Sequence, residues 1–389
     1  MSRSLPAPDA ALAAHSEAVV EHIRSAIRCA DGQLPFSEFM HLALYAPGFG
    51  YYVSGTQKFG EGGDFITAPE VSPLFGDVLA AQCAAVADRL GQAIEIVEYG
   101  GGSGRLAASI LQRLAQLERL PTYYTLIEVS AELRARQRAC VEQACPELAG
   151  RLRFVDAPQP ESVRGVIIAN EVMDALPCER FRIGESAVLQ AVVIESDEGL
   201  TIDWCEAPPA LAEEVEQLQA ALGERLPVGY VSELTPSLDG WLRTVSDSLV
   251  QGVILLADYG ADRHTLYAAE RLAGTFLCHY RQHAHEDAMW LPGGQDLTAW
   301  VDFSRAIEAL DAAGLCYLGY TTQSQFLLSG GLFEALQARA ADAQPALSRG
   351  VKTLTLPGEM GERFKFLGVH KHCDVRLPGF SGRDFGHQL

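Results

Sequence analysis

From residue 75 onward, apolar residues alternate between the spacing of a helix and that of a buried strand. Helical spacing covers residues 75–90, 105–117, 130–143 and 302–313. Short apolar runs predict strands at 94–99, 123–128, 152–155, 165–170, 252–257, 315–320 and 363–370. This alternation predicts an α/β fold, in which a mostly parallel sheet carries helices on both faces.

Two parts of the chain depart from this alternation. Before it, the pattern predicts helices at 11–30 and 36–45, followed by a Gly- and Pro-rich loop at 54–76 that is too apolar for a disordered linker. Within it, residues 181–204 alternate around a turn at 197–199, which predicts a β-hairpin, and helices are expected at 210–222 and 237–250. We therefore expect an N-terminal helical cap with a lid loop over 1–75, a core over 76–180 and 246–389, and an inserted hairpin and helical subdomain over 181–245.

The strand at 94–99 ends in the sequence Glu98-Tyr-Gly100-Gly-Gly102-Ser-Gly104-Arg105, directly before a predicted helix. Glycine accepts positive φ and lets backbone lie close to a ligand, so this turn predicts a nucleotide-sized seat at a helix N-terminus. A dinucleotide fingerprint would need glycine at position 105, and the Gly-Lys-Ser/Thr of a P-loop is absent. An acidic residue followed by alternate glycines is instead typical of S-adenosylmethionine (SAM) methyltransferases, with Glu98, Gly100, Gly102 and Gly104 at the cofactor.

Polar side chains also follow the later strands of the predicted sheet, where ligands of open parallel sheets bind. Glu128 ends the second strand and is expected to hold the ribose, since Ser130 is the better helix cap. Asp156 follows the third strand and is expected at the adenine. Asn170, Glu171 and Asp174 follow the buried fourth strand, which predicts a site for the methyl acceptor.

Charge and cysteine usage narrow the class of protein further. The net charge of −20 argues against a nucleic-acid partner and favours a basic protein segment. Nine cysteines without a C-x-x-C pair indicate free thiols in a reducing compartment, and the histidines between 279 and 285 lack the spacing of a metal site, so no metal is expected. With no apolar run of membrane-spanning length and no signal-like N-terminus, we expect a cytoplasmic protein without membrane insertion.

Several segments together resemble the MidA-like SAM-dependent methyltransferases, a family that includes the mitochondrial complex I assembly factor that methylates arginine. Besides the glycine motif, the matching segments are 63–76, 170–177, 258–260, 280–283 and 292–303. Trp300 departs from the pattern, because histidine commonly follows the Asp-Leu-Thr-Ala segment in this family. The resemblance implies a class I methyltransferase with a Rossmann-like core, an N-terminal cap and SAM as cofactor.

These observations lead to the hypothesis of protein arginine N-methylation linked to complex I assembly, with a quinone-side subunit of NADH dehydrogenase as substrate. Glu171 and Glu233 would clamp the guanidinium beside Asn170 and Asp174. The loop Gly63–Thr67 would act as a lid, with Asp64 and Thr67 at the cofactor. Two alternatives stay open, an assembly chaperone that uses SAM as a structural ligand and a small-molecule methyltransferase, and a homodimer is not excluded.

Overall fold

The computed structural model describes residues 5–53, 66–339 and 344–389, and packing divides them into two compact units. Unit 1 is made of residues 5–53, 174–238 and 263–300. Unit 2 is made of residues 66–173, 239–262, 301–339 and 344–389. The chain therefore passes between the units several times, and each unit combines segments that are distant in sequence.

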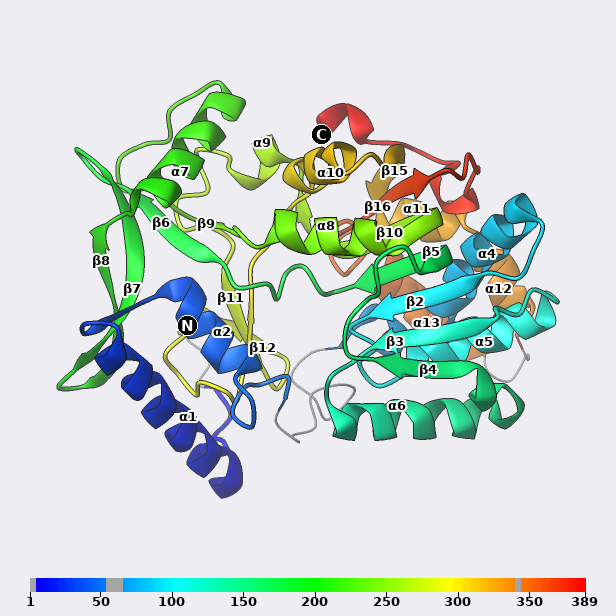
Figure 1. Ribbon diagram of the computed structural model, residues 1–389, viewed down its shortest axis with the longest axis horizontal. Helices are drawn as coiled ribbons and strands as arrows, with labels where there is room; N and C mark the ends of the chain where they lie inside the picture. Colours follow the sequence, from blue (N-terminus) through cyan, green and yellow to red (C-terminus); the bar gives the residue numbers. More distant parts are fainter. Residues whose placement is uncertain (1–4, 54–65, 340–343) are drawn as a thin grey trace. The chain divides into compact units, whose positions relative to one another are not determined.

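Unit 2 contains an eight-stranded sheet in the order β15-β16-β10-β5-β2-β3-β4, with β14 paired to β10. β5, β2, β3 and β4 lie side by side and parallel (Figure 1), and β10 is parallel to β5. β16 runs antiparallel to both β10 and β15. The strands are β2 (Glu95–Tyr99), β3 (Tyr123–Ile127), β4 (Leu152–Val155), β5 (Val163–Asn170), β10 (Leu249–Ala261), β14 (Val301–Asp302), β15 (Cys316–Thr322) and β16 (Phe364–Lys371).

Helices join these strands and bury their apolar sides against the sheet. Leu106, Ile110 and Leu114 on α5 are buried in the same core as Ile96 of β2 and Ile168 of β5. The helices are α3 (Ala68–Val71), α4 (Pro73–Leu90), α5 (Arg105–Gln116), α6 (Ala131–Ala144), α8 (Leu238–Ser248), α10 (Phe303–Ala312), α11 (Gln323–Ser329), α12 (Leu332–Gln337) and α13 (Gln344–Thr355), with short 3₁₀ turns at 146–151, 378–380 and 386–388. The predicted α/β class with a mostly parallel sheet is confirmed.

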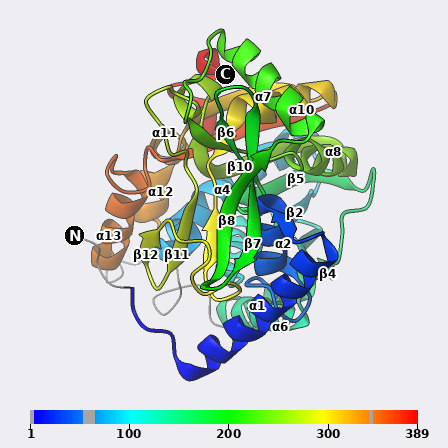
Figure 2. The same cartoon turned by 90° about the vertical axis from the view of Figure 1, so that its left-hand side faces the viewer.

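Unit 1 contains two smaller antiparallel sheets. One has the order β1-β7-β6-β9 with β8 paired to β7, and β7 and β8 form a long hairpin (Figure 2). The other has the order β12-β11-β13. The elements are α1 (Ala10–Cys29), β1 (Gln33–Pro35), α2 (Phe36–Tyr45), β6 (Glu179–Ile183), β7 (Val188–Ser196), β8 (Gly199–Glu206), α7 (Pro209–Leu222), β9 (Val231–Leu234), α9 (Arg263–Leu266), β11 (Leu277–Tyr280), β12 (His283–His285) and β13 (Asp296–Thr298).

A separate apolar core holds unit 1 together. Val19 and Ile23 of α1 are buried with Phe36 and Phe39 of α2, and β7 and β11 contribute to the same cluster. The hydrophobic spacing that predicted the first two helices therefore marks the side that faces this core. Among the described residues, no helix is long and apolar enough to cross a membrane.

The structure differs from the predicted pattern in several places, including the following three. A short helix, α3, lies inside the segment expected to be a loop, and β10 continues to Ala261. The prediction gave residues 246–389 to the core as a whole, whereas packing groups residues 263–300 with unit 1. The reason is that β11, β12 and β13 pair with one another in their own sheet.

Candidate cofactor and acceptor sites

The glycine turn between β2 and α5 has the backbone that its sequence predicts. Gly100, Gly102 and Gly104 have φ of 66°, 48° and 86°, in the left-handed region that favours glycine. A Cβ atom on Gly104 would lie 2.8 Å from Cα of Gln137, and one on Gly100 would lie 2.8 Å from Cγ2 of Val172. The turn is therefore both conformationally special and tightly packed, and it leads directly into the first turn of α5.

The short helix α3 fixes this turn from the side through Glu70. Ser103 Oγ donates a hydrogen bond to Glu70 Oε1, and Arg105 Nε lies 3.2 Å from Glu70 Oε2. The Glu70 side chain is only 6% exposed, whereas that of Arg105 is 58% exposed, so a buried carboxylate meets a cation that faces water. Sequence reasoning missed this residue, although it lies in the Gly63–Gly76 segment that carries the family resemblance.

Gln137 of α6 connects the glycine turn with Glu128. Its Nε2 donates to the Gly102 carbonyl at 3.1 Å and to Glu128 Oε2 at 3.1 Å. Glu128 Oε1 accepts from the Ser130 backbone N–H at 2.8 Å, and Ser130 Oγ caps α6 as expected. The half-buried Glu128 carboxylate thus lies at the end of β3, close to the glycine turn. That it holds the ribose of the cofactor stays a prediction.

Two predicted cofactor residues have other partners in the structure. Asp156 is 82% exposed and pairs with Arg134 Nη2 at 2.6 Å. Glu98 is 2% exposed and accepts a hydrogen bond from Tyr124 Oη at 2.6 Å inside the sheet's core. Burial raises the pKa of Glu98 to about 7. Contact of either carboxylate with the cofactor stays a prediction.

The remaining predicted cofactor residues come from the loop before α3. Thr67 is half-buried and directly precedes α3 as its N-cap residue. Asp64 and most of the predicted lid lie outside the described residues.

β5 ends at Asn170, and the next residue, Glu171, has a strained backbone. Glu171 has φ of 56°, which is unfavourable for a residue with a side chain, and such strain is typical of functional sites. Its Oε1 accepts from Asn170 Nδ2 at 3.1 Å and from the Ala68 N–H at 3.2 Å. Asn170 Oδ1 is buried and has no hydrogen-bond partner in the described part of the chain. A buried acceptor of this kind fits a ligand that brings its own donor.

Asp258 at the end of β10 holds the segment that follows Glu171. Its Oδ2 accepts from the backbone N–H of Val172 at 3.1 Å and of Met173 at 2.8 Å. The Asp258 side chain is fully buried. The sheet therefore fixes the position of residues 170–173 through a carboxylate on the neighbouring strand.

Asp174, the next predicted acceptor residue, belongs to an aromatic and acidic cluster in unit 1. The rings of Tyr45 and Tyr52 stack with centroids 5.5 Å apart, and Tyr52 Oη donates to Asp296 Oδ1 at 2.8 Å. Burial raises the pKa of both tyrosines, and the nearby charges of Asp296 and Asp174 raise it further. Asp174 and Asp296 are both buried. We call Tyr45, Tyr52, Asp174 and Asp296 the acceptor cluster.

Glu233, the second residue of the predicted clamp, has a structural setting in unit 1. Its side chain is buried, and its Oε2 accepts from the backbone N–H of Thr275 at 2.8 Å and from Thr275 Oγ1 at 3.3 Å. Arg180 Nε lies 3.4 Å from Oε1. Glu171 belongs to unit 2. These contacts give Glu233 a role in fixing β6 and β9 to the segment before β11, and its part in a clamp with Glu171 stays a prediction.

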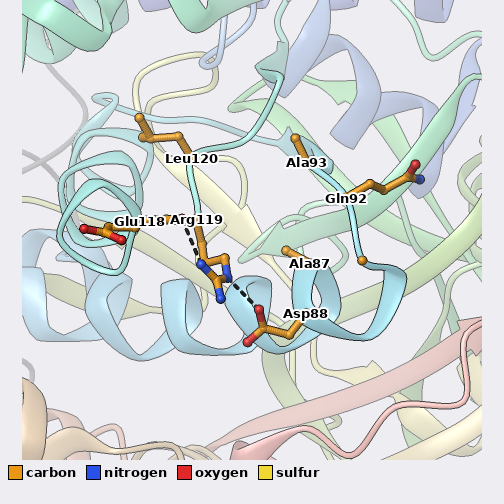
Figure 3. A pocket seen from close by; sticks show the side chains of 8 residues that line it. Ala87, Asp88, Gln92, Ala93, Glu118, Arg119 and Leu120 are labelled. Carbon is orange, nitrogen blue, oxygen red and sulfur yellow. Dashed lines mark hydrogen bonds and ion pairs between the residues drawn. The ribbon is translucent and has the colours of Figure 1, made fainter.

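A cavity of about 380 Å³ lies at the start of β2, the opposite end of the strand from the glycine turn. Arg119 and Asp88 face one another in it with Nε and Oδ1 2.5 Å apart (Figure 3). Ligands of open parallel sheets bind at the carboxyl ends of the strands. This cavity therefore lies at the end of the sheet that such ligands do not use, and binding of the cofactor at the glycine turn stays a prediction.

The sheet order with its antiparallel β16, and a glycine turn at the carboxyl end of β2, define a class I methyltransferase. The chain belongs to the family described as "Putative S-adenosyl-L-methionine-dependent methyltransferase", whose sequence model matches residues 78–321. The family resemblance drawn from the motifs is thus confirmed, and the protein is a SAM-dependent methyltransferase.

Solved structures and curated relatives agree with this assignment. A Burkholderia thailandensis protein described as a "likely methyl transferase", bound to S-adenosyl-homocysteine, superposes with a TM-score of 0.93 and is 39% identical, covering 99% of this chain and 100% of its own. The Danio rerio "Protein arginine methyltransferase NDUFAF7, mitochondrial" is 28% identical and covers 91% of this chain and 87% of its own. The Homo sapiens protein of the same name is 27% identical and covers 90% and 82%.

The residues of unit 2 fit SAM as the cofactor. The glycines keep side chains away from the turn that follows β2, and the orphaned Asn170 Oδ1 and the Glu128 carboxylate supply acceptors at the ends of β5 and β3, the strands on either side of β2. These are the groups that a ligand with amino and hydroxyl donors requires.

Proposed function

We propose that this methyltransferase methylates arginine side chains of a protein, and that its substrate is a quinone-side subunit of respiratory complex I. The relatives named as protein arginine methyltransferases align with about nine-tenths of the chain, which supports arginine as the target. The complex I part of the proposal rests on the family resemblance given above.

The acceptor cluster is the observation that carries the arginine proposal. A guanidinium is a planar cation that stays protonated, stacks on aromatic rings and binds carboxylates through a fixed fork of N–H donors. The stacked Tyr45 and Tyr52 and the buried Asp174 and Asp296 combine both kinds of partner in one place. Such a set suits an arginine side chain better than a neutral acceptor.

In this proposal the residues of the chain act mainly by positioning. Bound SAM supplies an electrophilic methyl group on a sulfonium. Gly100–Gly104 and Glu128 hold the cofactor, while Asp174 and Asp296 orient the guanidinium and draw its positive charge toward the nitrogens that do not react. Orientation of two reactants can lower a barrier by about 7–11 kcal/mol. The nitrogen that gains the methyl group must lose one proton, and the carboxylate of Asp174 or Asp296 would accept it.

Labelled methyl transfer tests the proposal. The enzyme is incubated with methyl-labelled SAM and the isolated quinone-side subunit, and the modified residue is identified by mass spectrometry. Asp296→Asn keeps an oxygen acceptor for Tyr52 and should reduce kcat about 100-fold, because the guanidinium loses a carboxylate that orients it.

The matched control is Asp203→Asn, which removes a charge from an exposed position on β8 and should leave kcat unchanged. SAM affinity, measured by calorimetry, should be the same in both variants. Label on a residue other than arginine, or full activity of Asp296→Asn, would overturn the proposal.

A further inference from the structure

Besides the cavity of unit 2 described above, unit 1 contains a cavity of about 340 Å³. It shares no residue with the acceptor cluster. Its walls come from β6, β8, β9, the segment between α9 and β11, the start of β11, and the residues that follow β12 and β13. The side chains that give it chemical character are Arg180, Trp204, Arg271, Phe276, Glu286 and Trp300. Two arginines beside three aromatic residues make an unusual lining for a protein with net charge −20.

Arg271 is the second arginine of this cavity, and it packs against an aromatic ring. Its guanidinium carbon lies 4.9 Å from the centroid of the Trp300 ring, so the aromatic face fixes its position. Its Nε is buried and has no hydrogen-bond partner among the residues that the structure describes. A buried, charged donor without an acceptor costs free energy unless a ligand provides the acceptor.

Arg180 differs from Arg271 because its charge is already balanced. Arg180 Nε lies 3.4 Å from Glu233 Oε1, and Glu233 is 5% exposed. The Arg180 guanidinium also lies 5.3 Å from the centroid of Phe276, which belongs to the wall of the cavity. Arg180 therefore shapes the cavity, and Arg271 is its other arginine, for which the described residues show no ion pair although Glu286 also lines the cavity.

Apart from Thr275 and the carboxylate of Glu286, the other side chains of the wall are apolar or aromatic. Trp204 and Phe276 present rings, and the exposed Leu272 lies at the cavity together with Val231. A cavity of this volume matches the lower end of the range for small-ligand sites, or one to two residues of a peptide. Its ligand must therefore combine an anionic group with an apolar or aromatic body.

We propose that this cavity is a binding site for a carboxylate attached to an aromatic group, with Arg271 as the residue that binds the carboxylate. The same chemistry is offered by a free aromatic carboxylic acid and by an acidic residue next to an aromatic one in a peptide. Trp300 and Trp204 would pack against the aromatic part. The site is independent of the proposed arginine methylation.

Binding of matched probes to the full-length protein tests this proposal. The probes are 4-phenylbutyrate, its neutral amide 4-phenylbutyramide, and the peptide N-acetyl-Phe-Asp-amide, each titrated by calorimetry and by tryptophan fluorescence. The charged probes should bind roughly tenfold or more tightly than the amide, because a charge-assisted hydrogen bond contributes that much. Tighter binding of the free acid or of the peptide identifies the natural source of the carboxylate.

Variants place the binding at this cavity. Arg271→Met should lower the affinity for 4-phenylbutyrate roughly tenfold or more and leave that for the amide unchanged. Arg119→Gln is the matched control, since it removes a cation from the cavity in unit 2 and should change neither affinity. Equal affinity for the acid and the amide in the wild-type protein, or unchanged acid binding by Arg271→Met, would overturn the proposal, and the first comparison needs no variant to fold.

Discussion

At the scale of single residues, two glycines with similar backbone angles have different surroundings. Gly104 has φ of 86° and Gly91 has φ of 65°. A Cβ on Gly104 would meet the backbone of Gln137, whereas a Cβ on Gly91 would meet nothing within 4 Å. Substitution of Gly91 therefore measures the free-energy cost of a left-handed backbone alone. Substitution of Gly104 adds the cost of close packing at the glycine turn.

We expect Gly91→Ala to destabilise the protein by about 1–2 kcal/mol, the cost of the backbone alone. Gly104→Ala should cost about 1–3 kcal/mol more, because Gln137 must shift, and should weaken SAM binding at least tenfold. Chemical denaturation and calorimetry with SAM measure both quantities. Equal SAM affinity of the two variants would contradict the assignment of the turn.

Glu98 predicts a pH dependence of stability. Burial raises its pKa from 4.5 to about 7, so the unfolded chain loses this proton at a lower pH than the folded protein does. The protonated Glu98 side chain therefore contributes fully to the free energy of unfolding below pH 4.5. This contribution is lost as the pH rises to 7, a change of about 3 kcal/mol. Glu98→Gln keeps the hydrogen bond to Tyr124 and does not titrate.

The free energy of unfolding of Glu98→Gln relative to wild type should therefore increase by about 3 kcal/mol between pH 4.5 and pH 7.5. Urea denaturation at the two pH values measures it. Glu132→Gln, at an exposed position on α6, is the control and should show no such change. A relative stability of Glu98→Gln that does not depend on pH would show that Glu98 is ionised in the folded protein.

At the scale of elements, α3 shows how a four-residue helix can fix a binding turn. Its Glu70 is linked to Ser103 and Arg105 at the end of the turn that α5 follows. Glu70→Ala should lower SAM affinity about tenfold, because the ion pair and the hydrogen bond by which the buried Glu70 carboxylate holds the turn are lost together. Glu132→Ala breaks an exposed pair on α6 and should change the affinity little. Calorimetry compares the two, and equal affinities would show that α3 does not support the turn.

The same element shows what sequence reasoning could reach. Local rules of periodicity and backbone freedom predict the bounds of α2 and β4 and the position of the glycine turn. The structure agrees closely with all three predictions. The roles of Glu70 and Gln137 depend on segments 33 and 35 residues away in the chain, which a single sequence does not bring together. Likewise, β11–β13 are three or four residues long and carry no apolar run, so tertiary packing decides that they pair with one another and not with the large sheet.

At the scale of the whole molecule, the net charge of −20 should matter for encounter with a basic substrate. Attraction between opposite charges raises association rates and is screened by salt. We expect kcat/KM for an arginine peptide with basic flanking residues to fall at least several-fold between 50 mM and 500 mM salt. A peptide with neutral flanks should show little change, and equal salt dependence of both would contradict an electrostatic contribution.

The central claim is that the glycine turn of unit 2 seats SAM. A crystal structure of this protein with S-adenosyl-homocysteine tests it most directly. The account predicts ligand density against Gly100–Gly104, with ribose oxygens at Glu128 and a donor of the ligand facing Asn170 Oδ1. Ligand density in the cavity beside Arg119, with no ligand at the glycine turn, would contradict this claim.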